Sequence, residues 1–392
     1  MGRFCLQESS MALCKLGLSS FGFALSQESK EKATFKCELV TQLLVQQDMN
    51  SFLLCLALAG QTVNSLVPSN LEKGWTYAQE FKSMAVLVMQ NEKVIFERYA
   101  NGGSKERGQA LASGSKSFCG TVAAAAVQDG LLKYDELVSD TFPEWKKDPL
   151  KAKITVRQLL NLTSGLDPGK SGTKDERSGW EDAKSSKMTG KPGEQFAYGP
   201  NPFNTFGLLM ETKLKTKSWE DYLNSRILKP LGISLKYVGR CADGRPQLAG
   251  GAWMTPSDWL TFGQFILQDG KWKGKQIIRK DMLDELYKPT KANPSYGMSW
   301  WLNKDAESSL VGRNVEPGLG DGFRMAAGAG KQRLYILPTQ NAVVLRMGKV
   351  VDRARGWSDN AFLGAILGQA VPDQRKRPRV RGELRKSMFD PR

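Results

Sequence analysis

The residues with the clearest chemical potential are serines followed three positions later by a lysine. This S-x-x-K pattern occurs at 29–32, at Ser113 and Lys116, and at 171–174. Residues three apart share one face of a helix, so the lysine amine can reach the serine hydroxyl and take its proton. Only the middle copy leads into small and apolar residues, 118–127, which predict a buried helix. The N-terminus of such a helix directs free N–H groups toward the serine, where they would stabilise an oxyanion.

The composition of the chain excludes several other catalytic classes. Its 392 residues include no histidine, which rules out Ser-His-Asp and Cys-His catalysis and every His-ligated metal site. Of the six cysteines, only Cys119 and Cys241 lie within the expected main domain, and their spacing indicates neither a disulfide framework nor a metal site. Cys119 is expected in the core. Catalysis by this chain must therefore use lysine, tyrosine, serine, aspartate, glutamate or cysteine, and we predict no metal or organic cofactor.

The formal charge of +16 raises the question of nucleic-acid binding. A dense cluster of arginine and lysine residues, however, lies in 371–392, after the last apolar segment. Such a run is typical of a solvated basic tail. The sequence therefore favours no nucleic-acid partner. Nucleic-acid binding by the tail is the alternative.

The first sixty residues predict two short regions before the main domain. Residues 1–48 have no sustained apolar period and predict a poorly structured extension. The segment 49–59 contains an apolar run that ends in Ala-Leu-Ala, which suits signal-peptidase cleavage. The run is too short for a stable membrane span. If translation starts at Met49, we expect an exported, periplasmic or secreted protein, and otherwise a cytoplasmic one.

Strands are predicted near both ends of the main domain, with helices between them. Two β-rich runs at 84–89 and 94–99 flank a polar turn, and two more at 333–337 and 342–346 flank another. This order predicts a sheet built from distant parts of the sequence and interrupted by a mainly helical lobe over about 120–245. A site is expected in the cleft between the two parts.

The middle S-x-x-K copy is the first of several sequence blocks that occur in a fixed order. The first block is Ser-Gly-Ser-Lys-Ser-Phe at 113–118, and the others occupy 159–166, 230–233, 250–258 and 296–301. Together they resemble the class C β-lactamases and their relatives, the DD-peptidases, family VIII esterases and 6-aminohexanoate-dimer hydrolases. The resemblance covers residues 80–370. It implies an α/β (α+β) β-lactamase/transpeptidase-like fold, in which an antiparallel sheet is flanked by helices. It also implies a serine hydrolase that forms an acyl-enzyme with a small-molecule ester, amide or peptide-like substrate.

The resemblance also implies a catalytic tyrosine in a Y-x-N turn, and two tyrosines compete for that role. Tyr222 matches the letters of the motif but lies in a predicted amphipathic helix. Tyr198 precedes Phe203 at the spacing that the family shows after its catalytic tyrosine. We therefore favour Tyr198, which with Lys116 would relay the proton of Ser113.

Two departures from the family pattern bear on the substrate. Pro200 stands where the family has asparagine, and Asn201 is displaced by one; proline offers neither a side-chain hydrogen-bond group nor a backbone donor. The K-T-G strand is replaced by a glycine-containing segment, in which Gly328, Ala329 and Gly330 would line the cleft. The resemblance implies that the Ala329 and serine N–H groups form an oxyanion hole. The alternative is that these glycines only permit tight packing.

One further motif and one further function remain to be weighed. Residues 358–360 spell the S-D-N of class A β-lactamases, but they follow the glycine segment and are better interpreted as the cap of a final helix over 358–370. The alternative function is a catalytically weak or silent member of the family that acts in binding or assembly. The presence of serine, lysine and tyrosine together argues against it.

Overall fold

The computed structural model describes residues 65–170, 172, 177–304, 319–320, 322–349 and 356–369. The extension 1–48, the candidate leader 49–59 and the basic tail 371–392 lie outside these residues. The serines and lysines of the S-x-x-K copies at 29–32 and 171–174 also lie outside the described residues. Within the described ranges, no helix is long and apolar enough to cross a membrane.

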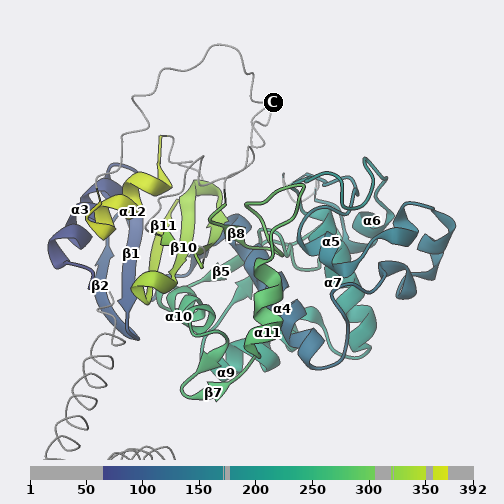
Figure 1. The fold of residues 1–392 in the computed structure, drawn as a ribbon, viewed down its shortest axis with the longest axis horizontal. Helices are drawn as coiled ribbons and strands as arrows, with labels where there is room; N and C mark the ends of the chain where they lie inside the picture. Colours follow the sequence, from purple (N-terminus) through teal and green to yellow (C-terminus); the bar gives the residue numbers. More distant parts are fainter. Residues whose placement is uncertain are drawn as a thin grey trace, which may run out of the picture. The chain divides into compact units, whose positions relative to one another are not determined.

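A six-stranded antiparallel sheet forms one part of the molecule (Figure 1). The strands are, in spatial order, β2 (Lys93–Tyr99), β1 (Ser83–Gln90), β11 (Ala342–Gly348), β10 (Gln332–Leu337), β9 (Arg324–Gly328) and β8 (Trp301–Leu302). The two predicted hairpins are confirmed as β1–β2 and β10–β11. β1 and β11 come from opposite ends of the domain and pair with each other, with Leu87 opposite Leu345.

Helices cover both faces of this sheet. Leu334 and Tyr335 are consecutive on β10 and therefore point to opposite faces. Leu334 lies against Gly263 of α10 (Pro256–Leu267), whereas the ring of Tyr335 lies 5.9 Å from that of Phe362 on α12. α12 (Asp359–Leu367) packs side by side with α3 (Pro68–Gln79), as Figure 1 shows.

The final helix begins as the sequence predicts. Ser358 is the N-cap of α12, and its Oγ accepts a hydrogen bond from the N–H of Ala361 at 3.2 Å. The S-D-N letters therefore mark a helix cap. The helix ends at Leu367, before Gly368 in the left-handed conformation that favours glycine.

The rest of the described chain forms a mainly helical part with two small sheets (Figure 1). Its helices are α4 (Lys116–Gln128), α5 (Val156–Leu160), α6 (Trp180–Ser185), α7 (Asn201–Leu214), α8 (Trp219–Leu223), α9 (Lys229–Leu231) and α11 (Lys280–Asp284). The small sheets are β3 (Gln109–Ala110), β5 (Ala252–Met254) and β4 (Lys236–Tyr237), and the pair β6 (Lys271–Trp272) and β7 (Lys275–Gln276).

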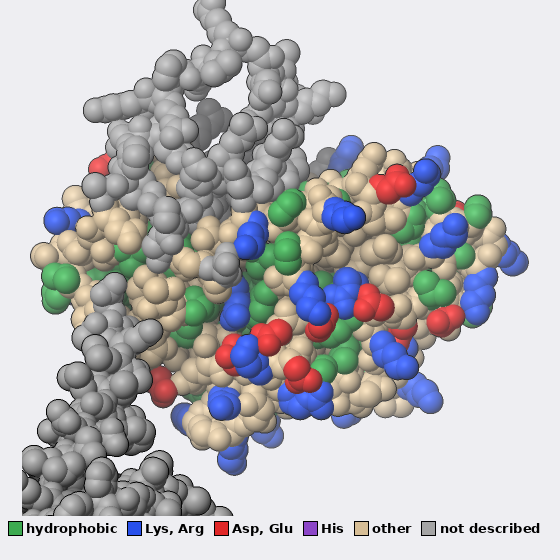
Figure 2. Space-filling view, viewed as in Figure 1, with side chains coloured by type: hydrophobic (Ala, Val, Ile, Leu, Met, Phe, Trp, Pro, Cys, Tyr) green, Lys and Arg blue, Asp and Glu red, His purple; other side chains and the backbone are tan. Residues whose placement is uncertain are grey.

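Helix α4 lies between the sheet and the other helices and is the structural centre of the site. Its residues 116–126 are all buried, because small side chains such as those of Ala123–Ala126 let neighbouring elements approach closely. Cys119 is fully buried, as expected. On the outer surface of this part, basic and acidic side chains are interspersed on the face shown in Figure 2.

Candidate active site

Ser113 lies in a strained turn immediately before α4. The turn is a 3₁₀ segment, Ala112–Ser115, and Ala112 has φ = +46°, a left-handed conformation that is uncommon for a residue other than glycine. Such a conformation costs about 1–3 kcal/mol and persists only when its surroundings enforce it. Here the Ser115 hydroxyl donates to the Ala112 carbonyl at 2.7 Å and accepts from the Ala252 N–H at 3.0 Å. The turn is thereby tied to β5, with Ser113 at the N-terminal end of a long buried helix.

Lys116 is the buried cation of the site, with 2% of its surface exposed. Its Nζ lies 3.1 Å from Ser113 Oγ and 2.9 Å from the carbonyl oxygen of Ala249. The same Nζ lies 4.5 Å from the ring centroid of Tyr198 and 5.7 Å from that of Phe203. In the described part of the chain no carboxylate forms an ion pair with it. The structure thus brings together the serine, lysine and tyrosine that the sequence singled out.

Aromatic packing holds Tyr198 beside the lysine. Its ring stacks on Trp301 of β8, with centroids 6.0 Å apart, and meets Tyr296 edge to face at 6.2 Å. Tyr222 has a different environment, since its hydroxyl donates to Asp129 Oδ2 at 2.7 Å. Burial and the Asp129 carboxylate raise the pKa of Tyr222, which disfavours its phenolate. The geometry therefore supports the choice of Tyr198.

The turn after Tyr198 explains how the site accommodates the missing asparagine. Pro200 is buried and precedes α7. The side chain of Asn201 donates from Nδ2 to Ser186 Oγ at 2.8 Å, and its buried Oδ1 has no hydrogen-bond partner among the described residues, so it does not bind Lys116. The lysine instead donates to the Ala249 carbonyl. Sequence reasoning missed this acceptor, because every residue has a backbone carbonyl and no side-chain pattern marks the one that is used.

The glycine segment reaches the nucleophile turn. Gly328 is the last residue of β9, and a Cβ atom there would lie 2.1 Å from the Leu111 carbonyl oxygen and 3.1 Å from the Gly114 nitrogen. No residue other than glycine permits this approach without a shift of the backbone. Ala329 follows and is exposed, and Gly330 has φ = +70°. Tight packing and a position beside Ser113 are therefore properties of the same segment.

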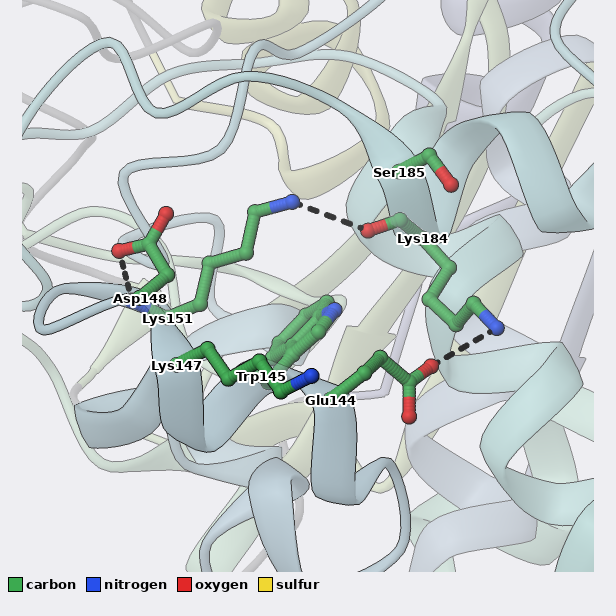
Figure 3. Close-up of a pocket in the computed structure, with 7 residues that line it drawn as sticks. All are labelled: Glu144, Trp145, Lys147, Asp148, Lys151, Lys184 and Ser185. Atoms are coloured by element: carbon green, nitrogen blue, oxygen red, sulfur yellow. Dashed lines mark hydrogen bonds and ion pairs between the residues drawn. The ribbon is translucent and has the colours of Figure 1, made fainter.

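A separate hollow of about 490 Å³ in the helical part has no comparable chemistry (Figure 3). Its polar groups are engaged with one another: Lys184 forms an ion pair with Glu144 at 3.0 Å, and Lys151 donates to the Lys184 carbonyl at 3.4 Å. Burial lowers the pKa of Lys151. The lining residues are Glu144, Trp145, Lys147, Asp148, Lys151, Lys184 and Ser185. Ser185 has no S-x-x-K partner there, and the described residues contain no group of three potential metal ligands.

Comparison with known proteins identifies the class to which this fold and site belong. A model of the β-lactamase family matches residues 48–364, and the chain belongs to that family. Among solved structures, the hydrolase EstCE1 has a TM-score of 0.61 at 16% identity, covering 76% of this chain and 98% of its own. A D-stereospecific amidohydrolase from a Streptomyces species has a TM-score of 0.56 at 15% identity, covering 76% and 99%. The predicted β-lactamase/transpeptidase-like fold is confirmed.

Similarity at the level of sequence is more limited. Protein flp of Staphylococcus aureus is 25% identical over 192 residues, which is 44% of this chain. The matched region spans 37% of that protein's length. The chain therefore spans less than half of the length of this relative, and the family rests on the match to the family model.

Proposed function

We propose that this protein is a serine hydrolase that cleaves esters or amides through an acyl-enzyme on Ser113. One observation carries the proposal: the amine of Lys116, buried and without a carboxylate partner in the described chain, lies 3.1 Å from the hydroxyl of Ser113. A nucleophile and a base within hydrogen-bond distance are the recurring arrangement in covalent catalysis. Tyr198 completes the group as a second proton carrier beside the lysine.

The chemical steps follow from this arrangement. Ser113 Oγ forms a bond to the substrate carbonyl carbon while its proton passes to the Lys116 and Tyr198 pair, and the carbonyl electron pair moves onto oxygen. The N–H groups of Ser113 and Ala329 stabilise that oxyanion. Collapse expels the alcohol or amine, which leaves with the transferred proton. Water then attacks the acyl-enzyme with the same pair as base, and the acid product is released.

The residues around this group favour an ester. A β-lactamase must hold an amide side chain and a ring carboxylate, but this chain has Pro200 in place of the asparagine and alanines in the glycine segment. Each charge-assisted contact contributes about 1.5–3 kcal/mol, so two or three missing contacts would weaken binding by several kcal/mol. An ester needs the nucleophile, its base and the oxyanion hole.

The proposal is tested by the mass of the intact protein after incubation with esters, amides, β-lactams and a serine-directed phosphonate. We expect a mass increase on the wild-type chain, none on Ser113→Ala, and an unchanged increase on Ser171→Ala. Ser171 is a matched control because it belongs to another S-x-x-K copy. A protein that forms no adduct with any of these compounds would be a silent member of the family. Labelling that persists in Ser113→Ala would place the nucleophile elsewhere.

A further inference from the structure

A second buried cation lies behind the glycine segment. Arg333 of β10 has 2% of its surface exposed and uses its whole guanidinium group. Its Nε and Nη2 donate to the two carboxylate oxygens of Asp359 at 2.7 and 3.2 Å. Its Nη1 donates to the carbonyl oxygens of Gly328 at 3.2 Å and of Gln332 at 3.0 Å. The arginine therefore connects helix α12 to the end of β9.

The partners of Asp359 keep this arginine in one orientation. The carboxylate also accepts hydrogen bonds from the Tyr335 hydroxyl and, at 3.1 Å, from Trp357 Nε1. Burial opposes the ionisation of Asp359, but the charge and hydrogen bonds of Arg333 outweigh it and hold the pKa of the carboxyl group below its usual value. A planar guanidinium gripped at two oxygens has little freedom. Its remaining nitrogen is consequently a fixed donor to Gly328.

The Gly328 carbonyl and the Ala329 N–H belong to a single peptide plane. In a trans peptide the C=O and N–H bonds point in opposite directions, and the described residues contain no cis peptide bond. A donor that holds the Gly328 oxygen on one side therefore sets the direction of the Ala329 N–H on the other. Gly328 itself packs against the Ser113 turn, so this N–H is close to the nucleophile in the fold.

We propose that Arg333 is a positioning residue that orients and polarises the Ala329 N–H as the second donor of the oxyanion hole. This inference rests on the proposed function. The buried guanidinium charge withdraws electron density from the Gly328 carbonyl, and a polarised peptide donates a stronger hydrogen bond from its nitrogen. The effect grows as negative charge develops on the substrate oxygen. It therefore stabilises the transition state more than the bound substrate.

The test uses variants that separate this role from stability. Arg333→Lys keeps the charge but lacks the planar fork, so it cannot hold both Asp359 and the Gly328 carbonyl. The double variant Arg333→Gln with Asp359→Asn removes both charges and leaves no unpaired ion in the core. Tyr335→Phe is the matched control, because it removes a hydrogen bond to the same carboxylate and leaves the Arg333–Gly328 contact in place.

The readout is the acylation rate for a nitrophenyl ester and for its thionoester, in which sulfur replaces the carbonyl oxygen. Sulfur is a weak hydrogen-bond acceptor, so the thionoester gains little from a well-placed N–H. Complete loss of one oxyanion donor lowers kcat by about 10²–10³-fold. For a misdirected donor we expect the ester rate to fall roughly tenfold to a hundredfold in both arginine variants, with the thionoester rate within about threefold of wild type. Tyr335→Phe should leave the ratio of the two rates unchanged.

The outcomes distinguish the two levels of the proposal. Equal losses for ester and thionoester, or an unchanged ester rate in folded Arg333→Lys, would overturn the positioning role alone. A selective loss in Tyr335→Phe as large as that in Arg333→Lys would also overturn it, because that variant retains the contact to Gly328. If the wild-type chain is never acylated on Ser113, the proposed function fails and the inference fails with it. Thermal unfolding of each variant establishes that the rates refer to folded protein.

Discussion

Two buried cations lie near the same glycine segment, and their environments differ. Lys116 and Arg333 are each 2% exposed. Arg333 has a carboxylate partner and two backbone carbonyls, so its charge is compensated. Lys116 has two oxygen partners and two aromatic rings, and no carboxylate among the described residues. The two side chains therefore differ in their partners, because a counter-ion holds Arg333 whereas oxygens and aromatic rings surround Lys116.

Lysine and arginine differ in the roles that they can take in buried sites. Arginine stays protonated in proteins, so its burial requires a permanent counter-ion. Lysine can lose its proton, and a neutral amine can accept the proton of a neighbouring hydroxyl. Under the proposed function the residue types suit these surroundings, with the permanent charge of Arg333 behind the glycine segment and Lys116 beside Ser113 as the proposed base.

The largest effect is expected on proton transfer. Lys116→Ala and Tyr198→Phe should each lower the acylation rate by about 10²–10⁴-fold, the usual contribution of a positioned acid or base. Tyr222→Phe is the control, because Tyr222 lies on α8 and its hydroxyl donates to Asp129 and not to a group of the site. Stopped-flow measurement of the acylation burst provides the rates. A greater loss in Tyr222→Phe than in Tyr198→Phe would show that the chosen turn is wrong.

The next effect concerns stability and should have opposite signs at the two cations. Arg333→Met leaves the Asp359 carboxylate buried and unpaired, so we expect the free energy of unfolding to fall by about 3–5 kcal/mol. Lys116→Met replaces an uncompensated cation by an apolar chain among aromatic rings. Its free energy of unfolding should stay equal to that of wild type or rise by roughly 1 kcal/mol, while activity is lost. Urea denaturation gives the free energy of unfolding of both variants. An equal loss of stability at the two positions would contradict the difference proposed between the two cations.

A smaller effect is expected at the residue between the two cations. Gly328→Ala would place a methyl group 2.1 Å from the Leu111 carbonyl oxygen. The strand end and the nucleophile turn must then move apart, at a cost of about 1–3 kcal/mol in stability. Esterase activity should fall as well, because the same contact places Ala329 near Ser113. Gly274→Ala is the control, since Gly274 has no atom within 4 Å of its added carbon, although its own positive φ makes a small loss of stability expected there. Full activity in Gly328→Ala would show that hydrolysis does not require Ala329 to lie this close to Ser113.

The smallest effect concerns the choice of substrate. Short-chain aryl esters should have a higher kcat/KM than any β-lactam, with small linear amides between them, because the contacts that hold a β-lactam are missing near Pro200 and in the glycine segment. A nitrophenyl ester and a chromogenic cephalosporin compared on one preparation provide the test. A tenfold preference for the cephalosporin, about 1.4 kcal/mol in transition-state binding, would show that other residues supply those contacts.

Features that depend on neighbours along the chain could be predicted from the amino-acid sequence. The hydroxyl and the amine of Ser113 and Lys116 meet because residues three apart share a helical face. The β10–β11 hairpin follows from two apolar runs around one turn, and the cap of α12 follows from a serine before an apolar helix. Each of these is a local consequence of backbone geometry, so a pattern of letters was sufficient.

Contacts between segments that are distant in the chain could not be predicted in this way and are visible only in the folded protein. The Ala249 carbonyl reaches Lys116 across 133 positions, and Arg333 meets Asp359 across 26. The sequence indicated Asp359 as part of a helix cap and carried no sign of its ion pair. Such contacts depend on how the sheet, α4 and α12 pack, and packing is a property of many side chains together. That is why the contact between Ser113 and Lys116 was predictable from the letters, whereas the groups that hold the two residues in place were not.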